Sequence, residues 1–180
     1  LLEFFKDVFT LFLDAVGPYV DMVEIGDDMG AQQNLLISPT MYRQLIKPVE
    51  IELYSLMKEK APNAVIFRHT DGAIFDIIPE LVEVGVSVLN PTQTSSAGMD
   101  GNRIKEAYGN IVTFHGAIEG IDNEDITIDD IVEQIKLRIK QLAPSGGYIL
   151  GSCNHMIDVQ PEFIQAFFDA AHEYGRYTKQ

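Results

Sequence analysis

Segments of two kinds alternate along the chain, and they differ in the spacing of their apolar residues. Residues 2–16 place apolar side chains on one helical stripe and are followed by a Gly-Pro pair, which predicts a helix. Ser38-Pro39 is typical of a helix start, and the helix predicted there runs to Glu59 with a kink at Pro48. The same criteria predict further helices over residues 78–85, 102–109 and 128–142, and from Pro161 onward.

Between these helices lie five short runs rich in Val, Ile and Leu, the composition of strands buried in a parallel sheet. Alternation of such strands with helices predicts an α/β fold. Doubly wound sheets and (β/α)8 barrels both give this order, and both bind ligands beyond the carboxyl ends of the strands. The predicted strands cover residues 20–26, 63–72, 86–93, 110–120 and 146–155.

Length and motif content favour the barrel, but only a part of one. A chain of 180 residues, 46% hydrophobic, can bury a core as one domain over residues 1–180. No glycine-rich phosphate fingerprint follows the first strand, which disfavours a dinucleotide-binding sheet. Five strands cannot close an eight-stranded barrel, which typically needs about 250 residues. The sequence therefore predicts a partial (β/α)8 barrel.

Charge and composition exclude several classes of function. The formal net charge of −14 disfavours a nucleic-acid ligand. Charged residues interrupt every long apolar stretch, so neither a membrane span nor a signal peptide is predicted. One cysteine allows no internal disulfide, and a reducing cytoplasm is the simplest expectation.

The candidate chemistry gathers at the carboxyl ends of the predicted strands, which include three of the four histidines and the single cysteine. His69 and Asp71 are two residues apart and would face the same side of a continuing strand. Joined by Cys153 from another strand, they would suit a catalytic zinc ion. The alternative is a hydrogen-bonded histidine, an Asp-Gly turn and a cysteine that is a small core residue.

Other polar residues follow the same strand ends. Glu24, Asp27 and Asp28 could bind a cation or substrate or orient a histidine, and they equally fit a solvated loop. Asn90 and Gln93 offer amide groups to a substrate. His115, Glu119, Asn154 and His155 are further candidates, as ligands or as partners of ligands. Motifs for serine nucleophiles, phosphate-binding loops and Cys-x-x-Cys sites are absent from the sequence.

Taken in order, the strand-end phrases resemble the C-terminal half of the uroporphyrinogen decarboxylase superfamily. The phrases are DDMG, SPTMYRQLIKP, FRHTDG, IIPELVEVGVSVLNPTQ, IKEAYGN, TFHGAIEG and GGYILGSCNH, with PE shortly after. The resemblance implies a (β/α)8 barrel of which this chain supplies about strands four to eight. It also implies a partner that covers the open edges, either the N-terminal half of the barrel or a second copy of the chain.

Two chemistries occur in this superfamily. The decarboxylase of porphyrin biosynthesis needs no cofactor and has a His-Gly pair near the last strand, where this chain has Cys153-Asn154. The cobamide-dependent methyltransferases hold zinc with a His-x-Cys motif and a later cysteine. His69 and Cys153 match two of these ligands, whereas Asp71 replaces the middle cysteine, and Glu119 or His155 could replace it as third ligand.

The resemblance therefore implies a zinc-dependent methyltransferase that exchanges a methyl group between a small-molecule donor or thiol acceptor and methylcobalamin carried by a corrinoid protein. An aspartate in place of a thiolate favours an oxygen- or nitrogen-bound methyl donor. The alternatives are a decarboxylase-like carboxy-lyase and a non-catalytic half-barrel scaffold. The predicted metal ligands are His69, Asp71 and Cys153; the predicted catalytic residues are Asp71, Glu119 and His155; the predicted substrate-binding residues are Asp27, Asp28, Asn90, Gln93, His115 and Asn154.

Overall fold

The computed structural model describes residues 1–177 and contains one parallel sheet. Its strands follow the order of the chain, β1-β2-β3-β4-β5, without the reversal that defines a doubly wound sheet. This order is that of neighbouring strands in a (β/α)8 barrel, and it confirms the predicted α/β fold with a partial barrel. The strands are β1 (Met22–Gly26), β2 (Val65–His69), β3 (Val86–Asn90), β4 (Thr113–Ile118) and β5 (Tyr148–Ser152).

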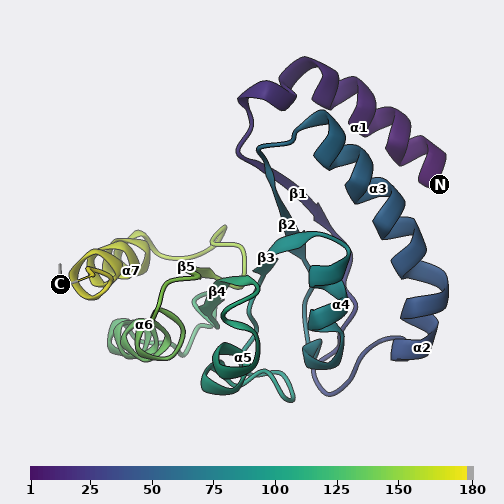
Figure 1. Cartoon of the computed structure of the whole chain (residues 1–180). Coiled ribbons are helices and arrows are strands. Elements are labelled where there is room, and N and C mark those ends of the chain that lie inside the picture. The colour runs from purple at the N-terminus through teal and green to yellow at the C-terminus, as the bar shows by residue number, and fades with distance from the viewer. Residues whose placement is uncertain (178–180) are drawn as a thin grey trace.

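The helices form an arc around one side of this sheet (Figure 1), from α1 and α3 past α4 and α5 to α6 and α7. They are α1 (Leu2–Val16), α2 (Pro39–Met41), α3 (Lys47–Lys60), α4 (Ile78–Glu83), α5 (Gly101–Tyr108), α6 (Ile128–Leu142) and α7 (Pro161–Tyr174). Shorter turns are η1 (Gly17–Tyr19), η2 (Tyr42–Ile46) and η3 (Phe75–Ile77). Within residues 1–177, no helix has the length and apolar character that crossing a membrane requires.

At the predicted kink near Pro48, the helix changes from a π-helical turn to an α-helix. A π-helical turn, η2, precedes α3, and Pro48 lies in the first turn of that helix. Proline has no N–H to donate, and its ring would collide with the carbonyl group four residues earlier in a regular helix. The wider turn avoids that collision. The predicted start is confirmed, because the Ser38 side chain accepts a hydrogen bond from the Met41 N–H at 3.1 Å.

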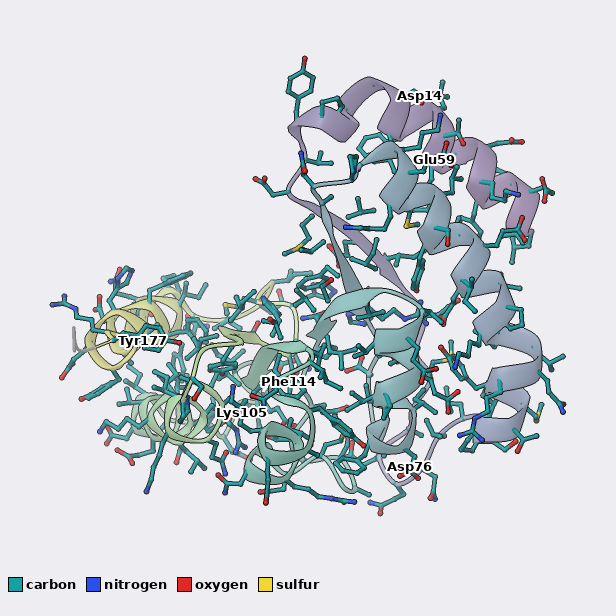
Figure 2. The ribbon with its side chains drawn as sticks, viewed as in Figure 1. Asp14, Glu59, Asp76, Lys105, Phe114 and Tyr177 are labelled. Atoms are coloured by element: carbon teal, nitrogen blue, oxygen red, sulfur yellow. The ribbon has the colours of Figure 1, made fainter. Side chains whose placement is uncertain are left out.

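The two faces of the sheet have different surroundings. Ile66, Leu89 and Phe114 are buried in the main core shared with the helices, and Phe114 lies inside the molecule in Figure 2. Alternate residues point to the opposite face, which would line the inside of a complete barrel. There Met22 and Ile149 are 42% and 41% exposed. The inner face of the sheet is therefore partly open.

A buried ion pair ties β2 to α3 on the helix side. The Arg68 guanidinium lies 3.1 Å from the Glu50 carboxylate, and the two residues are 3% and 6% exposed. Arg68 also donates to the Tyr54 hydroxyl at 3.0 Å and to the Asp27 carbonyl oxygen at 3.1 Å. Tyr42 donates its hydroxyl proton to Glu50 at 2.6 Å. This network anchors the residue that follows β1 at the carboxyl edge of the sheet.

Candidate functional site

The carboxyl ends of all five strands lie at one edge of the sheet because every strand pair is parallel. The residues that sequence analysis selected therefore gather along this edge, as predicted. The histidine and asparagine candidates His69, Asn90 and His115 lie on the strands themselves. The loops that follow the strands carry Asp27, Asp28, Asp71, Gln93, Glu119, Cys153, Asn154 and His155.

Three side chains form a group that could hold a metal ion: Asp28, His69 and Asp71, whose ligand atoms all lie within 4.8 Å of one another. His69 Nε2 is 3.5 Å from Asp28 Oδ1 and 3.6 Å from Asp71 Oδ2. The three side chains are 39–48% exposed. A solute can therefore reach them from the open inner face of the sheet.

The prediction that Asp71 lies on a continuing strand was wrong. Strand β2 ends at His69, and Gly72 then turns the chain with a φ of +86°, a conformation that favours glycine. The Asp71 N–H donates to Asp28 Oδ1 at 3.0 Å instead of joining the sheet. That bond brings the two carboxylates together across the ends of β1 and β2. Asp71 therefore faces His69 through loop geometry and not through strand periodicity.

The group fits a divalent cation in both charge and spacing. Burial, followed by the nearby charge of Asp28, raises the pKa of the Asp71 carboxyl above its ordinary value. A cation between the two carboxylates would relieve this repulsion. Ligand atoms about 2.0–2.1 Å from a tetrahedral zinc ion are about 3.4 Å apart. The 3.5 and 3.6 Å separations from His69 Nε2 agree with that value.

A row of three polar side chains crosses β2, β3 and β4 on the inner face. His69 pairs with Asn90 in the sheet, and Asn90 and His115 each follow the last printed pair of β3 and β4, Leu89 with Phe114. The Asn90 Oδ1 atom lies 2.8 Å from His69 Nδ1, and Asn90 Nδ2 lies 2.7 Å from His115 Nδ1. Both ends of the Asn90 amide are thus engaged by protein. Its predicted role in substrate binding stays a prediction.

His115 is set deeper than His69. Its ring meets Phe67 edge-to-face with centroids 5.1 Å apart. Gly151 of β5 leaves room for this ring, because a Cβ atom there would lie 2.8 Å from His115 Cε1. Burial lowers the pKa of His115 below its ordinary value, although the charge of Glu24 opposes the shift. The neutral imidazole is therefore favoured at neutral pH.

This lowered pKa predicts a specific pH dependence of stability. Below about pH 6.5, His115 takes up a proton more readily in the unfolded chain than in the folded one. The free energy of unfolding should then decrease as the pH falls from about 6.5 through the lowered pKa of the folded state. Urea unfolding between pH 7.5 and 5 should show a shallower loss for His115→Asn, which retains an acceptor near the Nδ1 position. The exposed His172→Asn variant is the matched control, and equal slopes for wild type and His115→Asn would refute the prediction.

Cys153 lies near the group but does not belong to it. Its Sγ atom is 3.8 Å from the Thr92 carbonyl oxygen, and its backbone N–H donates to Ile118 O at 2.8 Å. Burial, followed by the charge of Glu119, raises the pKa of the thiol to about 12. Without a cation the side chain is thus a neutral thiol at neutral pH. Its predicted role as a metal ligand stays a prediction.

Glu119 holds a loop. Its carboxylate accepts hydrogen bonds from the Thr94 hydroxyl at 2.8 Å, from the Ser95 N–H at 3.0 Å and from the Ser95 hydroxyl. Gln134 of α6 brackets the backbone of Glu119 with two bonds of 3.1 Å. Glu119 therefore connects the loop after β3 to the end of β4, and its predicted catalytic role stays a prediction.

Among the other predicted residues, Asp27 contributes its backbone, since its N–H donates to the His69 carbonyl oxygen at 3.2 Å and its carbonyl oxygen accepts from Arg68. Gln93 is hydrogen-bonded through its side chain, and two further residues are exposed. Gln93 accepts from the Gly72 N–H at 3.1 Å and donates to Gln32 at 3.3 Å, which supports the turn that carries Asp71. Asn154 and His155 lie exposed after β5, outside the Asp28–His69–Asp71 group. Their roles stay predictions.

Several residues that support the site were not predicted from the sequence. Gln32, Thr94 and Ser95 lie in loops. Polar residues are common in loops, so the residue types alone do not indicate a role in the site. Gln134 and the neighbouring Arg138, which donates to the Ala117 carbonyl at 3.2 Å, are four residues apart on α6. Two polar residues at that spacing on a partly buried helix face are a signal that could have been used.

Two comparisons with known proteins agree with this architecture, whereas no curated protein sequence matches the chain. A solved structure described as a methyltransferase from Methanosarcina mazei superposes with a TM-score of 0.70 at 18% sequence identity, covering 95% of this chain. The match covers 48% of that structure, so the chain spans about half its length. The sequence model of the uroporphyrinogen decarboxylase (URO-D) family matches residues 1–174. Because this match includes all five strands and the candidate metal group, the chain belongs to the URO-D family.

Proposed function

We propose that this chain is the metal-binding half of a corrinoid-dependent methyltransferase, and that Asp28, His69 and Asp71 hold zinc. The observation that carries the proposal is the spacing of this group. His69 Nε2 lies 3.5 and 3.6 Å from the two carboxylates, close to the separation of zinc ligands, and all three ligand atoms lie within 4.8 Å of one another. The fold is similar to that of a solved structure described as a methyltransferase, which agrees with this proposal. Cys153, which was predicted as a ligand together with His69 and Asp71, lies outside this group and stays a prediction.

The chemistry proposed for the site is transfer of a methyl cation. When bound, zinc supplies Lewis acidity, which lowers the pKa of a coordinated thiol or polarises a methoxy or methylamine group. Towards a thiol acceptor, the thiol first loses its proton to solvent. The S–CH3 bond then forms as the cobalt–carbon bond breaks, and the electron pair of that bond stays on cobalt, so cob(I)alamin and a thioether result. In the opposite direction, cob(I)alamin takes the methyl group while the donor's oxygen or nitrogen keeps the electron pair and gains a proton.

The side chains of this half divide the remaining tasks. Asp28 and Asp71 supply the negative charge that attracts the cation, and His69 supplies a neutral donor. Glu119 fixes the loop that carries Thr94 and Ser95 beside the site. The half-exposed group leaves space on the inner face of the sheet for the substrate and for a corrinoid protein.

The second half of the site is proposed to come from a partner that completes the barrel. The matched structure is about twice the length of this chain. Both edges of the sheet, β1 and β5, have one strand neighbour within residues 1–177. Helix α1 exposes Phe4, Leu11 and Phe12 to 62%, 78% and 55%, an apolar surface suited to a protein partner.

The test is spectroscopic. Zinc-loaded and metal-free chain would each be mixed with methylcobalamin and a simple thiol, and separately with cob(I)alamin and methoxy or methylamine donors. Because the two cobalamin states absorb differently, metal-dependent transfer is read directly as a change in visible absorbance. We expect demethylation of the oxygen- or nitrogen-bound donors. Thiol methylation without any demethylation would contradict the preference for those donors, and equal rates with and without zinc would contradict the metal's role.

A further inference from the structure

The Asn90 side chain is engaged by protein at both ends of its amide group. It lies between two imidazoles on the inner face of the sheet, with its oxygen towards His69 and its nitrogen towards His115. Its oxygen can only accept a hydrogen bond and its nitrogen can only donate one. The amide orientation therefore assigns a protonation state to each ring. With the amide in this orientation, His69 would carry a proton on Nδ1 and His115 would leave its Nδ1 unprotonated.

The consequence for His69 appears on the other side of its ring. With the proton on Nδ1, the neutral ring has an unprotonated Nε2 whose lone pair faces Asp28 and Asp71. The distances of 3.5 and 3.6 Å from Nε2 to these carboxylates exceed the usual range of a hydrogen bond. If the amide were reversed, His69 Nδ1 would be the acceptor and an Nε2–H group would face the carboxylates. Only the orientation in the structure presents an unprotonated ring nitrogen, with a free lone pair, to a cation.

We propose that Asn90 is a positioning residue that holds His69 in its metal-binding tautomer and couples that tautomer to the one of His115. This inference rests on the proposed metal site and deepens it, because it names the group that orients the nitrogen ligand. No other side chain of the same length can both accept a hydrogen bond from His69 and donate one to His115. Aspartate only accepts, leucine does neither, and glutamine is longer by one methylene group.

The surroundings of His115 keep the second end of the row in place. The Phe67 ring and the space over Gly151 confine the imidazole, so its Nδ1 atom stays directed at Asn90. The backbone supports the same row, since the Thr70 N–H donates to Asn90 O at 2.6 Å and the Thr92 N–H donates to His115 O at 2.8 Å. The lowered pKa of His115 agrees with an unprotonated Nδ1.

The test uses the whole chain labelled with ¹⁵N-histidine, whose long-range proton–nitrogen spectra report which ring nitrogen is protonated. At pH 8, wild type should show His69 protonated on Nδ1 and His115 protonated on Nε2. Asn90→Leu should release both rings to the mixture found in solution. Its zinc affinity, from competition with a chromophoric chelator, should fall about 10–100-fold, the usual effect of losing a group that orients a ligand.

Asn90→Asp tests the hydrogen bond to His69 separately from the hydrogen bond to His115. Its carboxylate can still accept from His69, so the His69 tautomer and the zinc affinity should stay within about threefold of wild type. It cannot donate to His115, whose proton should move to Nδ1. Asn110→Leu and Asn110→Asp, at an exposed turn before β4, are the matched controls and should change neither ring.

The outcomes distinguish this inference from the proposed function. Unchanged tautomers in Asn90→Leu, or a wild-type His69 protonated on Nε2, would overturn the role of Asn90 even if zinc binds tightly. The expected tautomers in a wild-type chain that binds no zinc would instead uphold the coupling and refute the metal proposal.

Discussion

His69→Ala is expected to abolish zinc binding by this chain. The substitution removes the nitrogen donor from a group of three and leaves two carboxylates, which bind zinc weakly without it. Wild type should retain about one zinc ion per chain after dialysis, and the variant should bind at least about 100-fold more weakly. Elemental analysis and chelator competition measure both quantities. A wild-type chain without zinc would sink this prediction, and the cofactor-free decarboxylase and scaffold alternatives would then take precedence.

Two further variants identify the other ligands. Asp28→Asn should weaken zinc binding if the group found in the structure holds the metal, whereas Asp21→Asn, at the opposite end of β1, should not. Cys153→Ala tests the ligand that the family resemblance implies. Loss of zinc in both Asp28→Asn and Cys153→Ala would indicate a four-ligand site that closes when the metal binds. Loss in Cys153→Ala with full retention in Asp28→Asn would contradict the group described above.

Glu50→Leu is expected to lower the free energy of unfolding by about 3–5 kcal/mol, the typical cost of leaving one buried charge without its partner. Arg68 is 3% exposed and would keep only neutral partners, the Tyr54 hydroxyl and the Asp27 carbonyl. The double variant Glu50→Leu/Arg68→Met should be clearly more stable than Glu50→Leu, since no uncompensated charge remains. Urea unfolding of the three proteins at pH 7 measures the difference.

Glu133→Ala is the control for this prediction. Glu133 pairs with Lys136 at 2.8 Å on the exposed side of α6, where solvent screens the charges, so its loss should change stability little. If Glu50→Leu behaves like this exposed control, the Arg68–Glu50 pair does not stabilise the junction between β2 and α3. Equal losses in the single and double variants would instead assign the effect to packing.

Much of the architecture could be predicted because its causes are local. Short apolar runs indicate strands, and apolar residues at helical spacing indicate helices. Both patterns can be recognised from residues that are close together in the sequence. Ser38-Pro39 and Thr127 begin helices as predicted, and Thr127 forms a capping box with Asp130. The positions of strand ends followed from the same pattern. Since parallel strands end at one edge, the location of the site followed as well.

The membership of the site could not be predicted, because it depends on contacts between distant segments. Asp28 and Asp71 are 43 residues apart, and the pairing of β1 with β2 and the Gly72 turn bring their side chains together. From the sequence alone, Glu119 would be expected to be a carboxylate without hydrogen-bond partners at the end of a strand. Only the fold places Thr94 and Ser95 against it.

The sequence by itself determined the order of elements, the edge of the sheet that carries the chemistry and His69 as a candidate ligand, because local spacing and residue type are sufficient for each. The tertiary structure alone decided that Asp28 completes the group, that Cys153 lies outside it and that Asn90 joins two histidines. The physical reason is register: a shift of one residue in β3 would turn Asn90 to the helix side and separate the row, with no change in the sequence of any strand.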